Sequence, residues 1–330
     1  MPQRTALVAG TLFALAAGLM WGLVFVAPLL LPAYPPALLS TARYLAFGLI
    51  ALPLAFLDRA RLRELTRADW TEAAKLALVG NLLYYVCLAA AIQRAGGPLP
   101  TVIIGTLPVV IAITANLRDA RRDGHLPWGR LAPSLALIAA GIALVNQAEM
   151  QHLQETQSAE LGRYALGALL AVGGVACWTW YPLRNADWLR AHPDRSPRAW
   201  ATAQGLATLP LSAIGLAVVW ISFGFSDSRF DMPLGPQPQR FVLLMLALGL
   251  LASWLGGLCW NEASQRLPTA LAGQLIVFET LAALAYAFAL RGSMPPATTL
   301  VGIVLLVAGV MWALRVKPES LPEVRAGAAH

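Results

Sequence analysis

The sequence predicts an all-α membrane protein with ten transmembrane helices in two inverted five-helix repeats and both termini in the cytoplasm. Three observations predict this class: the composition, an internal repeat, and an uneven distribution of Lys and Arg between alternate loops. Hydrophobic residues make up 58% of the 330 residues and charged residues only 12%. A soluble domain carries about 25% charged residues.

Ten apolar runs approach the length of about 20 residues that a helix needs to cross the hydrocarbon layer. They cover residues 6–31, 37–57, 72–94, 98–117, 127–146, 164–183, 199–221, 241–264, 268–290 and 295–314. The polar link 147–163 divides them five and five, which predicts a first repeat at 1–146, a periplasmic linker at 147–163, and a second repeat with a short cytoplasmic tail at 164–330. An odd number of spans in each half gives the halves opposite orientations.

The sequence contains an internal repeat, with one copy at residues 81–108 and the other at residues 253–276. A shift of 172 places Cys87, Gln93 and Arg94 on Cys259, Gln265 and Arg266, and a shift of 168 places Pro100, Thr101 and Gly141 on Pro268, Thr269 and Gly309. In each copy an apolar run ends at Gln-Arg and another starts at Pro-Thr. Proline is tolerated in the first turn of a helix, so each copy is predicted to be a tight helical hairpin.

The basic residues set the predicted orientation. With the N-terminus inside, seventeen Lys and Arg residues fall in or next to cytoplasmic segments and five in or next to periplasmic ones. Cytoplasmic loops of membrane proteins carry this excess. The same distribution assigns the net charge of +7 to membrane topology and not to nucleic-acid binding.

These features resemble the drug/metabolite transporter superfamily, in particular its ten-helix EamA-type members. The resemblance spans residues 6–315 and rests on the two five-span halves, on Arg43 within Ser-Thr-Ala-Arg-Tyr, on the two Pro-Thr helix starts, and on Gly141 and Gly309. Within the family the chain is most similar to the bacterial aromatic amino-acid exporters of the inner membrane. The resemblance implies a central cavity between the halves and export by alternating access. The chain departs from the family pattern at Gln274–Glu279, where many members have a Pro-containing apolar stretch, and at Arg291-Gly292, which replaces a common Gly-Glu pair.

Aromatic and amide side chains within the spans are the candidate substrate-binding groups. They are Trp21, Asn81, Tyr84, Tyr85, Trp178, Tyr181, Trp260, Asn261 and Gln274. The repeat places Asn81, Tyr84, Tyr85 and Leu88 on Ser253, Gly256, Gly257 and Trp260, so bulk in one half corresponds to space in the other. This difference predicts a cavity for an asymmetric, partly aromatic ligand. Helix packing through small residues and an interfacial aromatic belt are the alternative interpretations.

Two ionisable residues, Arg43 and Glu279, lie deep within predicted spans and are candidates for gating or coupling. Three hypotheses stay open. The two side chains could pair and hold the halves in one access state. Glu279 could be protonated in one state and ionised in the other, which would couple export to protons. Glu279 could also be a hydrogen-bonded structural group, and Arg43 a structural anchor.

The sequence predicts no enzyme, because it has no nucleophile–base pairing, metal-ligand spacing or phosphate loop. The predicted function is export of aromatic and other neutral or hydrophobic amino acids. A broad drug or metabolite exporter and a lipid-handling or structural membrane protein without a solute cavity are the alternatives. The predicted partners are a small-molecule substrate and the lipid bilayer, with no cofactor, no metal, no nucleic acid and no particular oligomer.

The topology makes a prediction for labelling. Single cysteines in place of Ser158 and Ser228, in a chain without Cys87, Cys177 and Cys259, should react with an impermeant maleimide applied from the periplasm, because both loops are predicted to lie there. A cysteine in place of Ser196 should react only after the membrane is permeabilised. Labelling of that position in intact cells would contradict the assignment.

Overall fold

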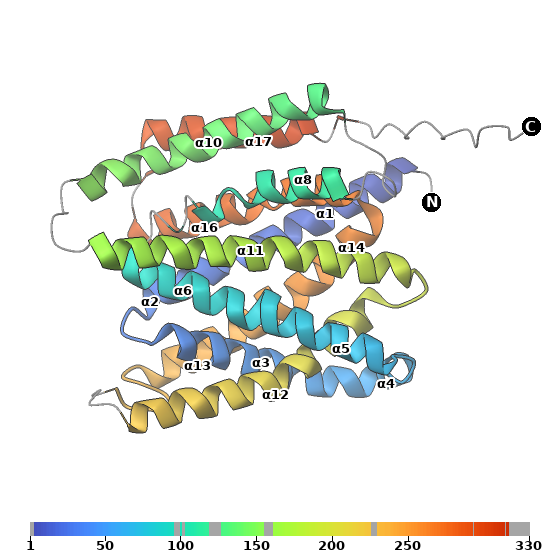
Figure 1. Cartoon of the computed structure of the whole chain (residues 1–330), viewed down its shortest axis with the longest axis vertical. Helices are drawn as coiled ribbons and strands as arrows, with labels where there is room; N and C mark the ends of the chain where they lie inside the picture. Colours follow the sequence, from blue (N-terminus) through green and yellow to red (C-terminus); the bar gives the residue numbers. More distant parts are fainter. Residues whose placement is uncertain are drawn as a thin grey trace, which may run out of the picture.

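The computed structural model describes residues 3–95, 100, 103–118, 127–154, 161–225, 230–292, 294–313 and 315–316. The regular elements in these ranges are helices that run side by side in one bundle (Figure 1). Seven of the helices are long and apolar enough to cross a membrane, and three shorter apolar helices occupy Leu107–Arg118, Trp128–Leu144 and Ala297–Ala313. The turn expected after Arg94 and the labelling positions Ser158 and Ser228 lie outside the described residues.

The helices follow the predicted apolar runs. The first half contains α1 (Gln3–Gly22), η1 (Leu23–Phe25), α2 (Val26–Leu30), α3 (Pro36–Leu57), α4 (Arg59–Leu62), α5 (Arg67–Lys75), η2 (Leu76–Leu83), α6 (Tyr84–Ala95), α8 (Leu107–Arg118) and α10 (Trp128–Gln154). The second half contains α11 (Leu161–Ala191), α12 (Pro197–Gly224), α13 (Pro238–Ala247), η3 (Leu248–Leu255), α14 (Gly256–Arg266), α15 (Thr269–Leu275), α16 (Val277–Arg291) and α17 (Ala297–Ala313).

Local sequence explains several helix ends. Pro36 and Pro197 stand at the first positions of α3 and α12, where the missing N–H of proline costs no hydrogen bond. Thr66 and Asp69 form a capping box at the start of α5. In the second copy of the repeat, α14 ends at Arg266 and α15 begins at Thr269. This confirms the tight hairpin that the Gln-Arg and Pro-Thr pattern predicts there.

The helix α10 continues further than the sequence analysis expected. It runs to Gln154, through the start of the predicted linker 147–163, and α11 begins at Leu161. Residues 147–154, which the sequence analysis assigned to the linker, are therefore helical. These residues are polar but include Gln, Ala, Glu, Met and Leu, which are strong helix formers, so polarity alone did not end the helix.

The two halves contact each other through matched pairs of helices. The pairs are α1 with α14, α6 with α11, α3 with α12, α8 with α15, and α10 with α17. The last pair forms an outer layer at one edge of the bundle in Figure 1, with α3 and α12 toward the opposite edge. A Cβ at Gly141 would lie 2.7 Å from the carbonyl oxygen of Gly302, and one at Gly309 would lie 2.9 Å from that of Ser134. The repeated glycines therefore let α10 and α17 approach closely.

The two halves also share an irregularity that the sequence did not predict. Residues 76–83 and 248–255 are π-helical segments, η2 and η3, each in the middle of a long helix. A shift of 172, the same as that of the sequence repeat, carries one segment onto the other. Since π-helical turns inside α-helices occur frequently at functional sites, their position directs attention to the space between them.

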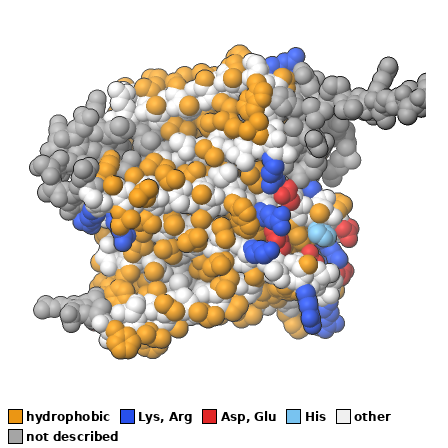
Figure 2. Space-filling view, in the orientation of Figure 1, with side chains coloured by type: hydrophobic (Ala, Val, Ile, Leu, Met, Phe, Trp, Pro, Cys, Tyr) orange, Lys and Arg blue, Asp and Glu red, His pale blue; other side chains and the backbone are white. Residues whose placement is uncertain are grey.

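The surface separates into an apolar belt and a charged end. Figure 2 shows hydrophobic side chains over most of the visible face, while acidic, basic and His side chains gather at the end that carries α4, α5 and the end of α11. Several exposed side chains of the belt are large and apolar, among them Leu169, Ile214 and Leu243. Such a belt fits contact with lipid. We call the end formed by residues 58–75 and 184–198 the charged end.

Candidate functional site

The candidate site is a buried cavity between the two halves. Its volume is about 20 Å³, which leaves room for about one water molecule. The lining residues are Trp21, Val24, Arg43, Tyr44, Asn81, Tyr84, Trp178, Tyr181, Ala252, Ser253, Gly257 and Glu279. Five of the nine predicted substrate-binding residues and both predicted gating or coupling residues are among them.

Arg43, on α3, is held in place from three sides. Its guanidinium carbon lies 4.7 Å from the ring centroids of both Tyr44 and Tyr85, within the range of a cation–π contact. Its Nε donates a hydrogen bond of 3.2 Å to Oγ of Ser253, across the boundary between the halves. The side chain is buried, and Nη1 has no hydrogen-bond partner among the described residues. The contacts thus fix the guanidinium but do not use the N–H groups of Nη1.

Glu279 lies next to a helix break. The helix α15 ends at Leu275 and α16 begins at Val277, so Glu279 stands in the first turn of α16. The positive end of a helix dipole favours a carboxylate at this position. Glu279 is buried, and within the part of the chain that the structure describes its Oε2 has no hydrogen-bond partner. Arg43 and Glu279 are both described, and no ion pair of 4.0 Å or less joins them, so the pairing hypothesis does not hold in this conformation.

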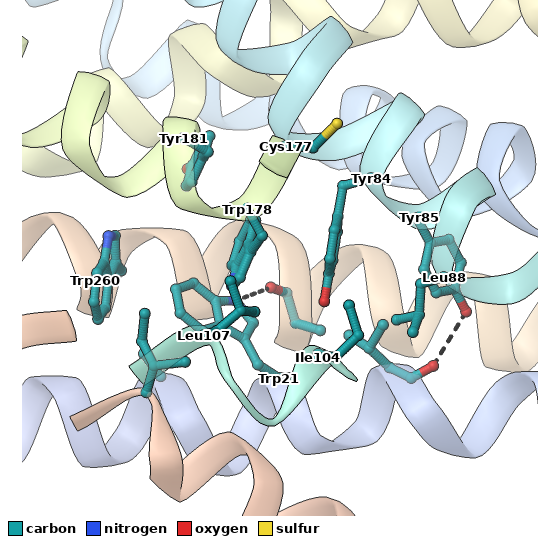
Figure 3. Packing of buried hydrophobic residues seen from close by; sticks show 14 of the residues in the cluster. Trp21, Tyr84, Tyr85, Leu88, Ile104, Leu107, Cys177, Trp178, Tyr181 and Trp260 are labelled. Atoms are coloured by element: carbon teal, nitrogen blue, oxygen red, sulfur yellow. Dashed lines mark hydrogen bonds between the residues drawn. The ribbon is translucent and has the colours of Figure 1, made fainter. Parts of the chain in front are cut away.

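Stacked aromatic rings form much of the cavity lining. The ring of Trp178 stacks on Tyr84 at 4.7 Å and on Tyr181 at 4.9 Å. Trp21 meets Trp178 edge-on at 5.1 Å and lies 5.2 Å from Trp260. Figure 3 shows these rings converging from helices of both halves. A ligand with an aromatic side chain would therefore have to enter or replace this stack.

The π-helical segments shape the cavity wall. Asn81 of η2 and Ser253 of η3 both line it, at corresponding positions of the repeat. Trp21 Nε1 donates a 2.9 Å hydrogen bond to the carbonyl oxygen of Ala252 in η3. A Cβ at Gly80 of η2 would lie 2.1 Å from the ring of Tyr181. Only glycine fits beside that ring, so η2 and the aromatic stack depend on each other.

The other four predicted residues lie outside the cavity lining. The ring of Tyr85 packs against the guanidinium of Arg43. Its hydroxyl donates a 3.2 Å hydrogen bond to the carbonyl oxygen of Val24. Trp260 lies behind Trp21. Asn261 and Gln274 are engaged elsewhere, the first with Asn185 and the carbonyl of Pro197, the second with Ser134.

Sequence reasoning did not place five lining residues at the site, namely Val24, Tyr44, Ala252, Ser253 and Gly257. Two signals could have found some of them. Tyr44 follows Arg43 directly, and Ser253 and Gly257 are the repeat counterparts of the predicted Asn81 and Tyr85. Val24 and Ala252 carry no polar group that would mark them in a sequence.

Ion pairs hold the halves together at the charged end. They join Asp58 with Arg198, Glu64 with Arg195, Glu72 with Arg184, and Arg118 with Asp187. The carboxylate of Asp58 is buried and also accepts a hydrogen bond from Thr202. Asp69 accepts a 2.8 Å hydrogen bond from Trp188 Nε1. All these contacts cross from the first half to the second, so the cavity is closed toward this end.

An aromatic contact closes the opposite end. Tyr34 is buried, stacks on Phe241 at 4.9 Å and meets Phe230 edge-on at 5.2 Å. Its hydroxyl donates to the carbonyl of Leu234 and accepts from the backbone N–H of Gln237, both at 2.8 Å. These partners belong to the second half. With both ends closed, this conformation is occluded.

An apolar helical bundle with a polar, aromatic cavity enclosed between two repeated halves defines the class of membrane transporters. Comparisons with known proteins specify the family. Residues 8–121 match the EamA-like transporter family. The chain is 56% identical over 313 residues to inner membrane protein YtfF of Escherichia coli (strain K12), covering 95% of this chain and 97% of that one.

The chain belongs to the EamA-like transporter family of the drug/metabolite transporter superfamily. It is therefore an inner-membrane transporter and not an enzyme, which confirms the membrane class and the family resemblance. A solved crystal structure aligns with a TM-score of 0.67 and 18% identity, covering 92% of this chain and 96% of that chain. At that identity the likeness concerns the fold.

The closed charged end makes a prediction about access to the cavity. Asp58→Asn removes the buried partner of Arg198, and a lost hydrogen bond to a charged group costs about 1.5–3 kcal/mol. The charged end should therefore open more often. A cysteine in place of Gly257 lines the cavity, where a Cβ meets nothing within 4 Å. Its labelling rate from that side, in a chain without native cysteines, should rise about tenfold or more.

The matched control is Glu64→Gln. Its carboxylate pairs with Arg195 but is 57% exposed, and exposed ion pairs contribute about 0–1 kcal/mol. Labelling should change little in this variant. Equal labelling in the parent chain, Asp58→Asn and Glu64→Gln would contradict the assignment of Asp58 to closure of this end.

Proposed function

We propose that this transporter exports aromatic and other neutral or hydrophobic amino acids by alternating access through the cavity between its halves. One observation carries the proposal: a buried cavity that combines stacked aromatic rings with one guanidinium and one carboxylate. An amino acid needs apolar room for its side chain and a few polar groups for its charged ends. The lining offers aromatic rings and polar groups from helices of both halves, and the stacked rings would part to make room for the side chain.

The arrangement behind this mechanism is ten spans in two inverted repeats, with both termini in the cytoplasm. The matched contacts between halves and the equivalent positions of η2 and η3 support the repeat. The excess of basic residues supports the orientation, with the charged end in the cytoplasm. The three shorter apolar helices then complete the ten spans.

Alternating access follows from how the two ends are closed. Ion pairs close the charged end, and aromatic packing around Tyr34 closes the other. Opening one end while the other stays closed would expose the cavity to one side at a time. The cavity is buried between the halves, which favours a solute as the ligand. A lipid ligand would need a groove that is open to the bilayer.

Transport by purified protein tests the proposal. Proteoliposomes should exchange radiolabelled phenylalanine, tyrosine or tryptophan, and Trp21→Ala, Tyr84→Ala and Trp178→Ala should each slow exchange about tenfold or more. The reason is that burial of an aromatic ring contributes on the order of 1.5–3 kcal/mol, and each variant removes a ring that would contact the substrate. Exchange rates at equal protein content in the vesicles provide the measurement.

The matched control is Trp220→Ala, which removes a tryptophan with 58% exposure on the lipid-facing surface of α12. It should leave exchange unchanged. The substrate proposal fails if the vesicles move none of the amino acids. The cavity assignment fails if all three cavity variants transport at the rate of the parent chain.

A further inference from the structure

Among the residues that the structure describes, two ionisable side chains of the cavity lining, Arg43 and Glu279, each have an atom without a hydrogen-bond partner. Nη1 of Arg43 is buried and donates no hydrogen bond to a described residue. Oε2 of Glu279 is buried and accepts none from a described residue. Native proteins pair nearly all such groups, so a buried exception calls for an explanation. The low dielectric of the bundle makes each unpaired charge costly. Two other lining residues, Tyr84 through its hydroxyl and Trp178 through Nε1, also have such an atom. The two that belong to ionisable groups are explained together by a ligand that pairs with both.

We propose that Arg43 and Glu279 select ligands that carry both a carboxylate and an ammonium group. Arg43 binds the carboxylate and Glu279 binds the ammonium group. The inference rests on the proposed export of amino acids and specifies which of their groups the site reads. A ligand with one charge would leave the opposite residue unpaired beside it.

The architecture keeps the two residues apart. The rings of Tyr44 and Tyr85 and the hydroxyl of Ser253 hold the guanidinium. Tyr85 is in turn anchored by its hydrogen bond to the carbonyl of Val24. A direct Arg43–Glu279 ion pair would use up both charges and leave nothing for a ligand. The three contacts on Arg43 hold its guanidinium away from a direct ion pair. The cavity has a volume of about 20 Å³ in this conformation, so a zwitterion reaches both groups only when the aromatic rings move apart.

The surroundings supply no competing charge. The remaining ionisable residues of the lining are Tyr44, Tyr84 and Tyr181, which are neutral phenols at ordinary pH. The hydroxyl of Tyr181 donates a hydrogen bond to Oε1 of Gln204. Besides these phenols, the ionisable groups of the lining are one guanidinium and one carboxyl group, which together can pair with a ligand that carries a carboxylate and an ammonium group.

A set of three ligands on one scaffold tests the inference. Phenylalanine carries both groups, phenethylamine only the ammonium, and 3-phenylpropionate only the carboxylate. Binding to the purified full-length protein is measured by isothermal titration calorimetry. The parent chain should bind phenylalanine about tenfold or more tightly than either analogue, since one charged hydrogen bond contributes about 1.5–3 kcal/mol.

Two variants should change selectivity in opposite ways. Arg43→Gln should weaken phenylalanine and 3-phenylpropionate about tenfold or more and leave phenethylamine unchanged or tighter. Glu279→Gln should weaken phenylalanine and phenethylamine to a similar extent and spare 3-phenylpropionate. Ser253→Ala keeps both charges and frees the guanidinium. It should weaken the two carboxylate ligands only, and it provides a second test should Arg43→Gln fail to fold.

The contradicting outcomes are distinct. Equal weakening of all three ligands in every variant would assign Arg43 and Glu279 to structure alone and overturn the inference, while amino-acid export stands. Equal binding of the three ligands by the parent chain would overturn it as well. Absence of binding by all three, together with no amino-acid exchange in proteoliposomes, would overturn the proposed function and with it this inference.

Discussion

The structure depends on how an apolar bundle accommodates two opposite charges, Arg43 and Glu279, without joining them. Charged groups inside a membrane are costly, and side chains that hold them are usually functional. Here the neighbouring helices reduce that cost. Aromatic faces and the hydroxyl of Ser253 surround the guanidinium. Glu279 belongs to the first turn of α16, where the helix dipole favours a carboxylate. The break at Ile276 is what brings a helix start to the cavity, since broken helices in transporters place their ends at binding sites.

The repeated fold places equivalent helices on both sides of the cavity. The cavity lining itself is formed by residues that differ between the two halves. The segments η2 and η3 occupy equivalent positions, yet Gly80 makes room for Tyr181 while a Cβ at Gly256 would lie 2.8 Å from Nε1 of Trp21. A glycine in each half therefore provides space for an aromatic ring that belongs to the other half. The sequence analysis named Gly256 as the small counterpart of Tyr84, but it did not include Gly80. Periodicity did not predict the π-helical turns, because one inserted residue per segment barely alters the apolar pattern.

Much of the fold and part of the site could be predicted from the sequence. Apolar length predicted the helices, and rare charges within them predicted Arg43 and Glu279, because membrane burial makes such residues conspicuous. Asn261 and Gln274 looked equally suitable but bind Asn185 and Ser134, away from the cavity lining. The rotation of each helix depends on tertiary packing, which a single sequence does not contain. Polar residues that serve packing and those that serve a ligand therefore look alike before the fold is known.

The most direct measurement is an experimental structure of the full-length protein with 4-bromophenylalanine, whose bromine can be located by anomalous scattering. The account predicts a bromine position among Trp21, Tyr84 and Trp178, with the ligand carboxylate at Arg43 and its ammonium group at Glu279. A bound ligand elsewhere, or a ligand in this cavity whose charged groups contact neither residue, would contradict it.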